Sequence, residues 1–467
     1  MRLQFLGANK QVTGSRYRLD VGDLTLLIDC GMYQERSCLH RNWEPSPVEP
    51  RAIDRLLLTH AHLDHCGLIP KLVGKGYRDP ILATPPTIDL ARVVMEDAAH
   101  IQEEDAAYKR RRHKRENRKG PHPAVPLYTA EDAQAAGGLF RTVQYGKPVD
   151  LSEDVTVTWH DAGHILGSAM LEIVARDNGN SKRIIFSGDV GEWDSPLMRD
   201  PATFDKADYI IMESTYGDRD HAADGDVSER LTRIVNETVQ RGGNLIIPTF
   251  AIDRAQDLLY YFSRLAADER IPHLGVSLDS PMAIDATTIY KTYKYLMDEE
   301  TQSFVASGEH PFQFAGLHFA RTRDESRRIN SMSDPRIIMA GSGMCTGGRI
   351  KYHLRQNIER PESTILFVGY QAEHTLGRHI VSGAKEVRIH GRRYPVRARI
   401  ERIDGLSAHA DRSGLMRWLG GFQSAPRRLF LTHGEADVAA SLASHVQDRL
   451  GWDVRVPEYE EIADLGS

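Results

Sequence analysis

Four potential metal ligands fall within six residues of the sequence, directly after an apolar run at residues 56–58. They are His60, His62, Asp64 and His65, in the pattern H-x-H-x-D-H. Imidazole nitrogens and carboxylate oxygens are ligand types that zinc accepts. On a loop at the end of a strand, His60 and His62 can point one way while Asp64 and His65 point another. The pattern therefore predicts two metal ions that share one rim.

Histidine and aspartate side chains also stand at the ends of strand-like runs elsewhere in the chain. These residues are Asp29, His164, Asp189, His409 and His433. Because strands of one sheet system can bring their ends together along an edge, we expect these side chains to lie near the His-rich loop.

The secondary structure that must position these residues changes along the chain from mostly strands to alternating strands and helices. The N-terminal part reads as strands, with hairpin signals at residues 22–23 and 178–180. From about residue 206, strand and helix patterns alternate, which is typical of βαβ units and a parallel sheet. After about residue 375 the sequence again predicts mostly strands, as in the N-terminal part. At 467 residues the chain is too long for one ordinary core, so we predict an α/β protein divided at 1–206, 207–375 and 376–467.

Composition is that of a globular protein, with 41% hydrophobic and 27% charged residues and no apolar run long enough to cross a bilayer. The first seven residues predict a strand and not a signal peptide. The four cysteines lack paired spacing, which argues against a disulfide framework. We therefore expect a soluble, cytoplasmic protein with no membrane partner. A net charge of −6 argues against a generally cationic coat but leaves room for a local basic groove.

With these motifs the chain resembles the β-CASP nucleases of the metallo-β-lactamase superfamily over nearly its whole length. That group includes the endonuclease of mRNA 3′-end processing and the bacterial J-type ribonucleases. The resemblance implies a metallo-β-lactamase αββα sandwich with an inserted α/β β-CASP domain, and two zinc ions per chain. The implied zinc ligands are His60, His62 and His164 for one ion, Asp64, His65 and His433 for the other, and Asp189 as a bridge.

Three further residues match catalytic or supporting positions of the family. Asp29 resembles the aspartate that supports the metal cluster, Glu213 the acid of the first β-CASP motif, and His409 the histidine of the second. The histidine at position 433 occupies the third motif, where relatives thought to act on DNA carry valine, so it favours RNA.

Two metal ions about 3.5–4 Å apart can lower the pKa of a bridging water towards about 7 and neutralise charge in the transition state. The leaving ribose oxygen also needs a proton. We assign that role to His409, with Glu213 accepting its other N–H. The products would carry a 5′-phosphate and a 3′-hydroxyl. The alternative is that His409 is a surface residue near a helix start.

Candidate phosphate contacts lie in the middle of the chain. The segment at residues 341–349 resembles the glycine-rich loop of the family, between a strand and a helical pattern, where backbone N–H groups can cradle a phosphate. Its candidate residues are Ser342, Gly343, Gly347, Gly348 and Arg349. Arg254 at a helix start is another candidate, for which an ordinary salt bridge is an equal alternative, and Asp253 beside it can simply cap that helix.

The segment at residues 96–119 begins acidic and ends with eight cations against one acid between residues 109 and 119. This order complements a helix dipole, and Gly120-Pro121 would stop the helix. We predict a projecting helix whose basic end, including Arg110, Arg111 and Arg112, contacts RNA. The alternative is a solvated or disordered charge run.

These observations predict a zinc-dependent ribonuclease that acts on single-stranded RNA in processing or decay. The choice between endonuclease and 5′ exonuclease remains open, as does a homodimer. One alternative is a metallo-hydrolase of a small ester, lactone or thioester, which would leave Glu213 and His409 without a task. Another is a non-catalytic RNA-binding scaffold, which is the weaker alternative because every ligand position is filled.

Overall fold

The computed structural model describes residues 1–117, 120, 123–177, 179–221, 226–369, 371–372 and 374–466. Arg118, Lys119 and Pro121, which the sequence assigned to the basic end and stop of a helix, lie outside these residues. The chain forms two compact units. The first comprises Met1–Asp220 and His409–Ser467, and the second comprises His221–Ala408.

The first unit is built on two seven-stranded sheets. In sheet order, the first contains β22 (Ile462–Asp464), β1 (Arg2–Phe5), β2 (Tyr17–Val21), β3 (Leu24–Ile28), β4 (Arg55–Leu57), β5 (Ile81–Ala83) and β6 (Phe140–Thr142). The second contains β21 (Val454–Arg455), β20 (Arg428–Thr432), β11 (Tyr209–Glu213), β10 (Asn180–Phe186), β9 (Ala169–Asp177), β8 (Val155–Asp161) and β7 (Val149–Ser152).

Alternating side chains explain how these two sheets face each other. β2 buries Tyr17, Leu19 and Val21, and β8 buries every second residue in the same way. These side chains meet in one hydrophobic core that includes Trp159 and Phe186. An alternating pattern buries one face of each strand, so the second faces remain for helices to cover.

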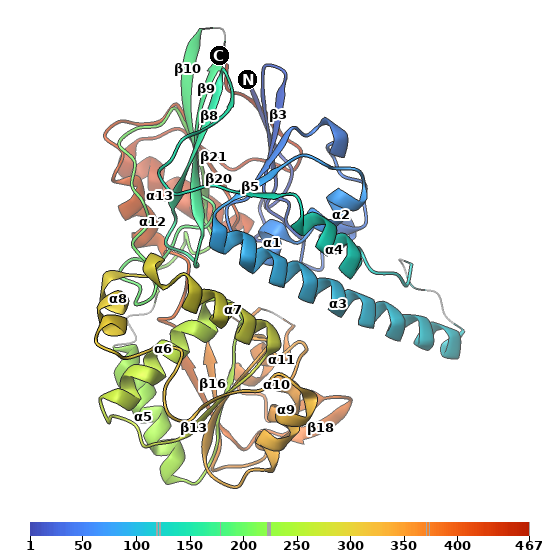
Figure 1. The fold of residues 1–467 in the computed structure, drawn as a ribbon, viewed down its shortest axis with the longest axis vertical. Helices are drawn as coiled ribbons and strands as arrows, with labels where there is room; N and C mark the ends of the chain where they lie inside the picture. Colours follow the sequence, from blue (N-terminus) through green and yellow to red (C-terminus); the bar gives the residue numbers. More distant parts are fainter. Residues whose placement is uncertain are drawn as a thin grey trace. The chain divides into compact units, whose positions relative to one another are not determined.

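Helices cover the outer faces. α12 (Arg412–Leu419) and α13 (Ala436–Leu450) pack on the second sheet through a separate apolar cluster that contains Trp418 and Leu442. Figure 1 shows α1 (Leu63–Cys66), α2 (Ile69–Gly74), α3 (Pro85–Glu116) and α4 (Ala130–Gly137) beside the first sheet. Helix, sheet, sheet and helix make the predicted αββα sandwich, which is confirmed.

The long helix α3 leaves the body of the first unit at its C-terminal end (Figure 1). Thr84 caps its start by accepting a hydrogen bond from the Thr87 N–H, and Pro85 occupies the first turn. Its buried side chains end at Ala106. Asn117 ends the helix in a left-handed conformation, earlier than the predicted Gly120-Pro121 stop.

The second unit contains a six-stranded parallel sheet. In sheet order its strands are β14 (Leu317–Phe319), β13 (Gly275–Asp279), β15 (Arg336–Ala340), β12 (Leu245–Pro248), β16 (Thr364–Val368) and β19 (Arg399–Ile403). Its helices are α5 (Val227–Gln240), α6 (Arg254–Ala267), α7 (Pro281–Thr292), α8 (Glu299–Ala306), α9 (Arg323–Ser331), α10 (Ile350–Asn357) and α11 (Leu376–Val381). A separate hairpin joins β17 (Glu386–Ile389) to β18 (Arg392–Pro395).

The limits of the two units differ from the expected divisions at 206 and 375. β11 pairs in parallel with β10 and β20, which keeps residues up to Asp220 with the first unit. β19 pairs in parallel with β16, so this strand belongs to the second unit's sheet and not to the returning sandwich. The strand-like patterns after residue 375 led us to place β19 in the sandwich. Strand length and composition do not reveal which sheet a strand joins.

Candidate metal centre

The His-rich loop lies between β4 and the short helix α1. Close backbone packing fixes its path, since the Cys30 N–H donates to the His65 carbonyl and the Ser15 N–H donates to the Asp64 carbonyl. Gly31 has to be glycine here, because a Cβ at that position would lie 1.6 Å from the Asp64 carbonyl oxygen. The loop is therefore held on both sides before any metal binds.

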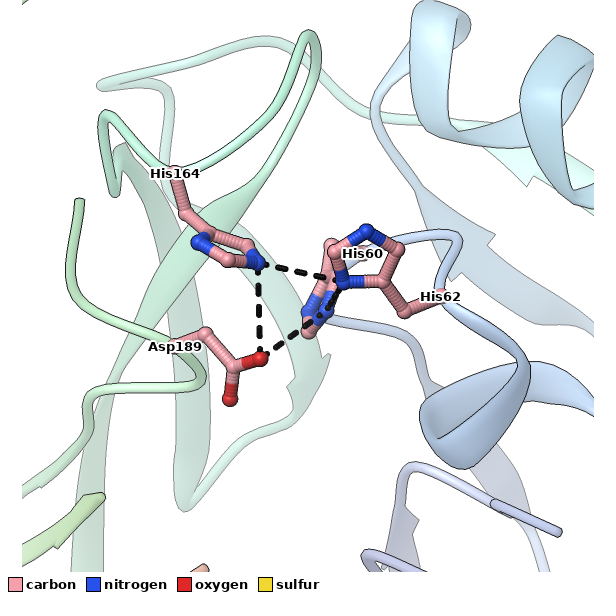
Figure 2. A group of neighbouring side chains, drawn as sticks. All are labelled: His60, His62, His164 and Asp189. Atoms are coloured by element: carbon pink, nitrogen blue, oxygen red, sulfur yellow. Dashed lines mark hydrogen bonds and ion pairs between the residues drawn. The ribbon is translucent and has the colours of Figure 1, made fainter. Parts of the chain in front are cut away.

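Three histidines and one aspartate converge in the first ligand group, which Figure 2 shows with their nitrogen and oxygen atoms turned toward one another. His62 Nδ1 lies 3.2 Å from His60 Nε2 and 3.1 Å from His164 Nε2. Asp189 Oδ2 lies 3.3 Å from His60 Nε2 and 3.5 Å from His164 Nε2. His164 comes from the loop after β8, and Asp189 from the segment after β10.

Asp64, His65 and His433 form the second group. His433 Nε2 lies 3.1 Å from His65 Nε2 and 3.4 Å from Asp64 Oδ2. The other oxygen of Asp189, Oδ1, lies 3.3 Å from His65 Nε2 and 3.6 Å from His433 Nε2. One carboxylate thus faces both groups, one oxygen to each.

These distances fit metal ligation. A tetrahedral zinc with bonds of about 2.0–2.1 Å holds its ligand atoms about 3.3–3.4 Å apart, which is close to the spacing of both groups. Asp189 Oδ1 is buried and makes no hydrogen bond, so it has lost water without an aligned donor in return. Facing imidazole nitrogens need a proton or a cation between them. The donor set therefore fits cations at both positions.

The pKa values of the histidines in the first group agree with this assignment. Burial, followed by the neighbouring His65, lowers the pKa of His60 to about 3, and burial lowers the pKa of His62 to about 4. Both rings are neutral at pH 7, as metal ligands must be. Burial alone would raise the pKa of Asp189, but the imidazoles of His433 and His65 hold it well below its usual range. Asp189 is therefore an anion.

Asp29 orients the second group from behind. Its Oδ2 lies 2.8 Å from His65 Nδ1. The Thr59 N–H donates to Asp29 Oδ1 at 2.8 Å, and the Thr59 hydroxyl donates to Oδ2 at 2.8 Å. A carboxylate on the distal nitrogen of a ligating histidine fixes its tautomer and orientation. Asp29 and Asp189 outweigh the effect of burial and raise the pKa of His65 well above its ordinary value in the absence of a cation.

His409 lies at the edge of the first group, with Nε2 4.0 Å from Asp189 Oδ2. Its Nδ1 lies 3.0 and 3.1 Å from the two oxygens of Glu213. The segment that carries it is fixed by a hydrogen bond from the Ala410 N–H to the Val190 carbonyl. Only 20% of the His409 side chain is exposed, which argues against the surface alternative. Asp189, Glu213 and His409 also lie close enough together to hold a cation.

Thr215 is a supporting residue that sequence reasoning missed. Its hydroxyl lies 3.0 Å from His433 Nδ1, where it fixes the ring as Asp29 fixes His65. The only local signal was its place two residues after Glu213. A threonine in such a position is common without any role, so the sequence alone could not single it out.

The candidate phosphate residues of the second unit form a closed loop after β15. The Gly347 N–H donates to the Ser342 hydroxyl at 3.2 Å. A Cβ on Gly343 would meet the Phe250 ring at 2.8 Å, and Gly348 adopts a φ of +73° that favours glycine. Gly343 and Gly348 thus have a structural reason that is independent of any phosphate, whereas a Cβ at Gly347 would meet no atom within 4 Å.

The guanidinium of Arg349 is engaged by protein groups. Its NH1 donates to Asp279 Oδ1 at 2.6 Å, and its NH2 donates to the Arg321 carbonyl at 2.7 Å. Its charge is already matched by a carboxylate with no exposed surface. These contacts hold the loop in place, and a phosphate contact of Arg349 stays a prediction.

Arg254 and Asp253 also differ from the simple alternatives. The Nε and NH1 of Arg254 are buried and make no hydrogen bond. Asp253 precedes α6 with a φ of +70°, and its side chain does not cap that helix. The equal alternative of an ordinary salt bridge at Arg254 is thus not what the structure contains, and its phosphate contact stays a prediction.

Comparison with known families agrees with the fold and the ligand cluster. A metallo-beta-lactamase superfamily domain matches residues 18–193, a Beta-Casp domain matches residues 255–380, and a Zn-dependent metallo-hydrolase RNA specificity domain matches residues 393–457. The protein is thus a metallo-β-lactamase hydrolase with a β-CASP domain. Within the described residues, no helix is long and apolar enough to cross a membrane.

Individual relatives indicate to which family within this class the chain belongs. Ribonuclease TTHA0252 of Thermus thermophilus is 35% identical and matches over 99% of both chains. The transcription termination factor FttA of Methanocaldococcus jannaschii is 32% identical over 96% of this chain and 69% of its own length, and that of Methanosarcina mazei is 31% identical over 97% and 70%. The chain belongs to the β-CASP ribonuclease family.

A solved structure shares the fold at low sequence identity. It is a protein of unknown function from Enterococcus faecalis, with a TM-score of 0.57, 12% identity and coverage of 99% of both chains. This similarity shows the architecture alone.

Proposed function

We propose that this chain is a zinc-dependent ribonuclease that hydrolyses single-stranded RNA with two zinc ions per chain. The observation that carries the proposal is the shared carboxylate: Asp189 directs one oxygen to each ligand group while His409 stands beside it. The relative matched over 99% of both chains is named a ribonuclease, which supports the same activity.

His60, His62 and His164 would hold one ion, and Asp64, His65 and His433 the other, with Asp189 between them. Zinc bound there supplies Lewis acidity and lowers the pKa of a coordinated water. Asp29 and Thr215 contact the Nδ1 atoms of His65 and His433, which orients these two rings toward the second metal position.

His409 would donate the proton that the leaving ribose 3′-oxygen needs, giving a 3′-hydroxyl and a 5′-phosphate. Its Nδ1 is engaged by Glu213, which leaves Nε2 directed at the edge of the ligand cluster. The carboxylates around His409 outweigh burial and raise its pKa to about 9, so the ring is protonated at neutral pH and can act as an acid.

We assign RNA binding to the second unit, His221–Ala408, and to the basic end of α3, which contains Arg110, Arg111 and Arg112. These limits replace the expected 207–375 for the β-CASP domain. We place the activity in the cytoplasm, in keeping with four free cysteines. The proposal admits a homodimer, whose presence light scattering of the purified protein would decide.

The metal-loaded protein should be incubated with 5′-labelled single-stranded RNA, with duplex RNA, with a lactone and with a thioester. We expect cleavage of the single strand to products with 5′-phosphate and 3′-hydroxyl ends. Turnover of the lactone or thioester with intact RNA would favour a small-ester hydrolase. RNA binding without cleavage would favour a scaffold. Matched substrates with 5′-phosphate and 5′-hydroxyl ends separate endonuclease from 5′ exonuclease action.

A further inference from the structure

The first unit contains a cavity of about 380 Å³ that none of the proposed metal ligands lines. Its walls come from the ends of β2 and β3, the loop at residues 41–50, helix α2 and Tyr459 near the C-terminus. Its volume lies in the range of small-molecule sites, about 300–1,000 Å³. The reaction proposed for the metal centre does not use this cavity.

Arg16 forms a buried cationic wall of the cavity. The residue is only 6% exposed, and its Nε makes no hydrogen bond. Among the residues that the structure describes, no carboxylate lies within 4.0 Å of its guanidinium. Its side-chain partner is the Cys30 thiol, and burial raises the pKa of this thiol above its ordinary value, so it is neutral near pH 7 and supplies no matching charge. A buried guanidinium stays charged, so this wall holds an unmatched positive charge.

Arg41 adds a second cation with a free donor. Its guanidinium carbon lies 3.8 Å from the centroid of the Tyr459 ring and 5.6 Å from that of Tyr33. Its NH1 is buried and makes no hydrogen bond. The Tyr459 ring attracts the guanidinium by a cation–π interaction, and the NH1 group can donate to an anion.

The other charged side chains that line the cavity are two lysines and two glutamates. Lys71 Nζ donates to the carbonyl oxygens of Asn42 and Glu44 at 2.6 Å each, which fixes the loop over the cavity. Lys75 lies one turn further along the chain and is exposed. The carboxylates among the lining residues belong to Glu44 and Glu49, both exposed. The interior is therefore cationic and the acids face solvent.

Aromatic surface completes the lining. Tyr33, Trp43 and Tyr459 contribute flat apolar faces, and the Tyr33 hydroxyl is already used in a hydrogen bond to the Leu6 carbonyl at 2.8 Å. A small inorganic anion would satisfy the arginines and leave most of the volume and these rings unfilled. A ligand that joins an anion to a planar ring matches both features.

We propose that this cavity binds a nucleoside monophosphate, with its phosphate on Arg16 and Arg41 and its base against the aromatic side chains. The nucleotide can be free or the terminal nucleotide of an RNA. This inference does not depend on catalysis at the metal centre, since a mononucleotide has no phosphodiester bond to hydrolyse.

Isothermal titration of the metal-loaded protein tests the proposal with AMP, ribose 5-phosphate and inorganic phosphate. We expect one AMP per chain and at least tenfold weaker binding of the two ligands that lack a base. Arg41→Gln and, separately, Tyr459→Leu should each weaken AMP binding about tenfold or more. Arg36→Gln, an exposed arginine of the same region that does not line the cavity, should leave it unchanged.

Three results would overturn the inference: no AMP binding, binding of inorganic phosphate as tight as that of AMP, or AMP binding that both cavity variants leave unchanged. The last result would place the nucleotide elsewhere. Thermal melting of each variant checks that it folds, so that lost binding is interpretable. Because Arg16 is buried, Arg16→Met is a secondary variant, and the test rests on Arg41 and Tyr459.

A 5′-phosphorylated trinucleotide with phosphorothioate linkages separates the two sources of the ligand. Displacement of AMP by this trinucleotide at similar concentration indicates an RNA end, and displacement by free mononucleotides alone indicates a free nucleotide. Both support the cavity as a nucleotide site. If neither the trinucleotide nor the free mononucleotides displace bound AMP, the proposal is overturned.

Discussion

His409 Nδ1 lies 3.0 Å from Glu213 Oε1, although 196 positions separate the two residues in the sequence. The same oxygen accepts the Val190 N–H at 2.7 Å, so the carboxylate is itself fixed in place. Burial alone would lower the pKa of His409, but Glu213 outweighs it and the pKa rises to about 9. The pair therefore controls both the direction and the protonation of the ring.

Replacing Glu213 with glutamine should move the alkaline limb of the pH–rate profile to lower pH. His409 donates a proton only while protonated, and the Glu213 carboxylate raises its pKa, which extends the protonated state to higher pH. Without the Glu213 charge the ring loses its proton earlier. The measurement is kcat on RNA against pH, with the exposed Glu153→Gln as control. An unshifted limb would show that His409 is not the titrating acid.

His409→Ala should keep the metal content and lose about 10²–10⁴-fold in rate, the usual range for a general acid. The reason is that seven other side chains already supply both ligand groups. Elemental analysis and single-turnover cleavage of RNA measure the two properties on one preparation. Loss of one metal equivalent would make His409 a ligand, and an unchanged rate would leave it without a role in the reaction.

Much of this centre could be predicted because each ligand follows a strand whose apolar run is visible in the sequence. The run before His60 and the run before Asp189 mark strand ends, and sheets bring strand ends together. The αββα sandwich with its inserted α/β unit followed from the same patterns and from the family resemblance. The predicted cluster is therefore a consequence of local signals that agree with one another.

Other features depend on partners that no local pattern reveals. β19 has the length and composition of a sandwich strand, yet it pairs with β16 of the second unit. Arg349 follows a glycine-rich loop as a phosphate-binding residue would, yet its guanidinium meets the buried Asp279. Thr215 supports His433 across 218 positions. In each case the deciding contact is distant in sequence.

Asp189→Ala should lose both metal ions and all measurable cleavage, because one carboxylate serves both ligand groups. Its two oxygens lie 3.3 Å from His60 Nε2 and from His65 Nε2. Elemental analysis after dialysis measures the metal content. Asp23→Ala, in the exposed turn between β2 and β3, is the matched control and should retain two equivalents. Two retained metal ions in the Asp189 variant would contradict the bridging assignment.

Glu192→Gln should stabilise the fold at alkaline pH and leave it unchanged near pH 4. Burial, followed by the nearby Asp411 carboxylate, raises the pKa of Glu192 to about 7. A carboxyl group with a raised folded-state pKa favours folding below its ordinary pKa of about 4.3, and this contribution is lost as the pH rises through about 7. Glutamine does not ionise, so it avoids that loss.

Thermal melting of the metal-loaded protein at pH 4.5 and pH 8 measures this effect. The expected melting temperature of Glu192→Gln exceeds that of the parent at pH 8, with a smaller difference at pH 4.5. Because the side chain is partly exposed, water screens part of the effect, and the gain should be a fraction of about 1.4 kcal/mol per pKa unit. Equal differences at both pH values would mean that ionisation of Glu192 is not the cause.

The C-terminal part of α3 offers the last prediction, because it presents several exposed cations, of which Arg112 and Arg115 pair with Glu116. Arg112 Nε donates to Glu116 at 3.0 Å, a surface pair that contributes little to stability, and Arg110 NH1 donates to the Ala124 carbonyl. Arg111 and Lys114 are exposed. The helix runs to Glu116 with Asn117 as its C-cap, which favours a helical arm over an irregular charge run.

Replacing Arg110, Arg111, Arg112 and Lys114 with serine should flatten the salt dependence of single-stranded RNA binding. Each phosphate contact contributes about 0.7 to the slope of log K against log salt, so four lost contacts lower it by up to about three. Cleavage of the shortest substrates should be spared, because they do not reach from the metal centre to the arm. A charge-matched control carries serine at exposed positions Arg2, Arg141, Lys147 and Lys206. The arm does not bind RNA if both variants change the slope equally, since the loss then reflects net charge alone.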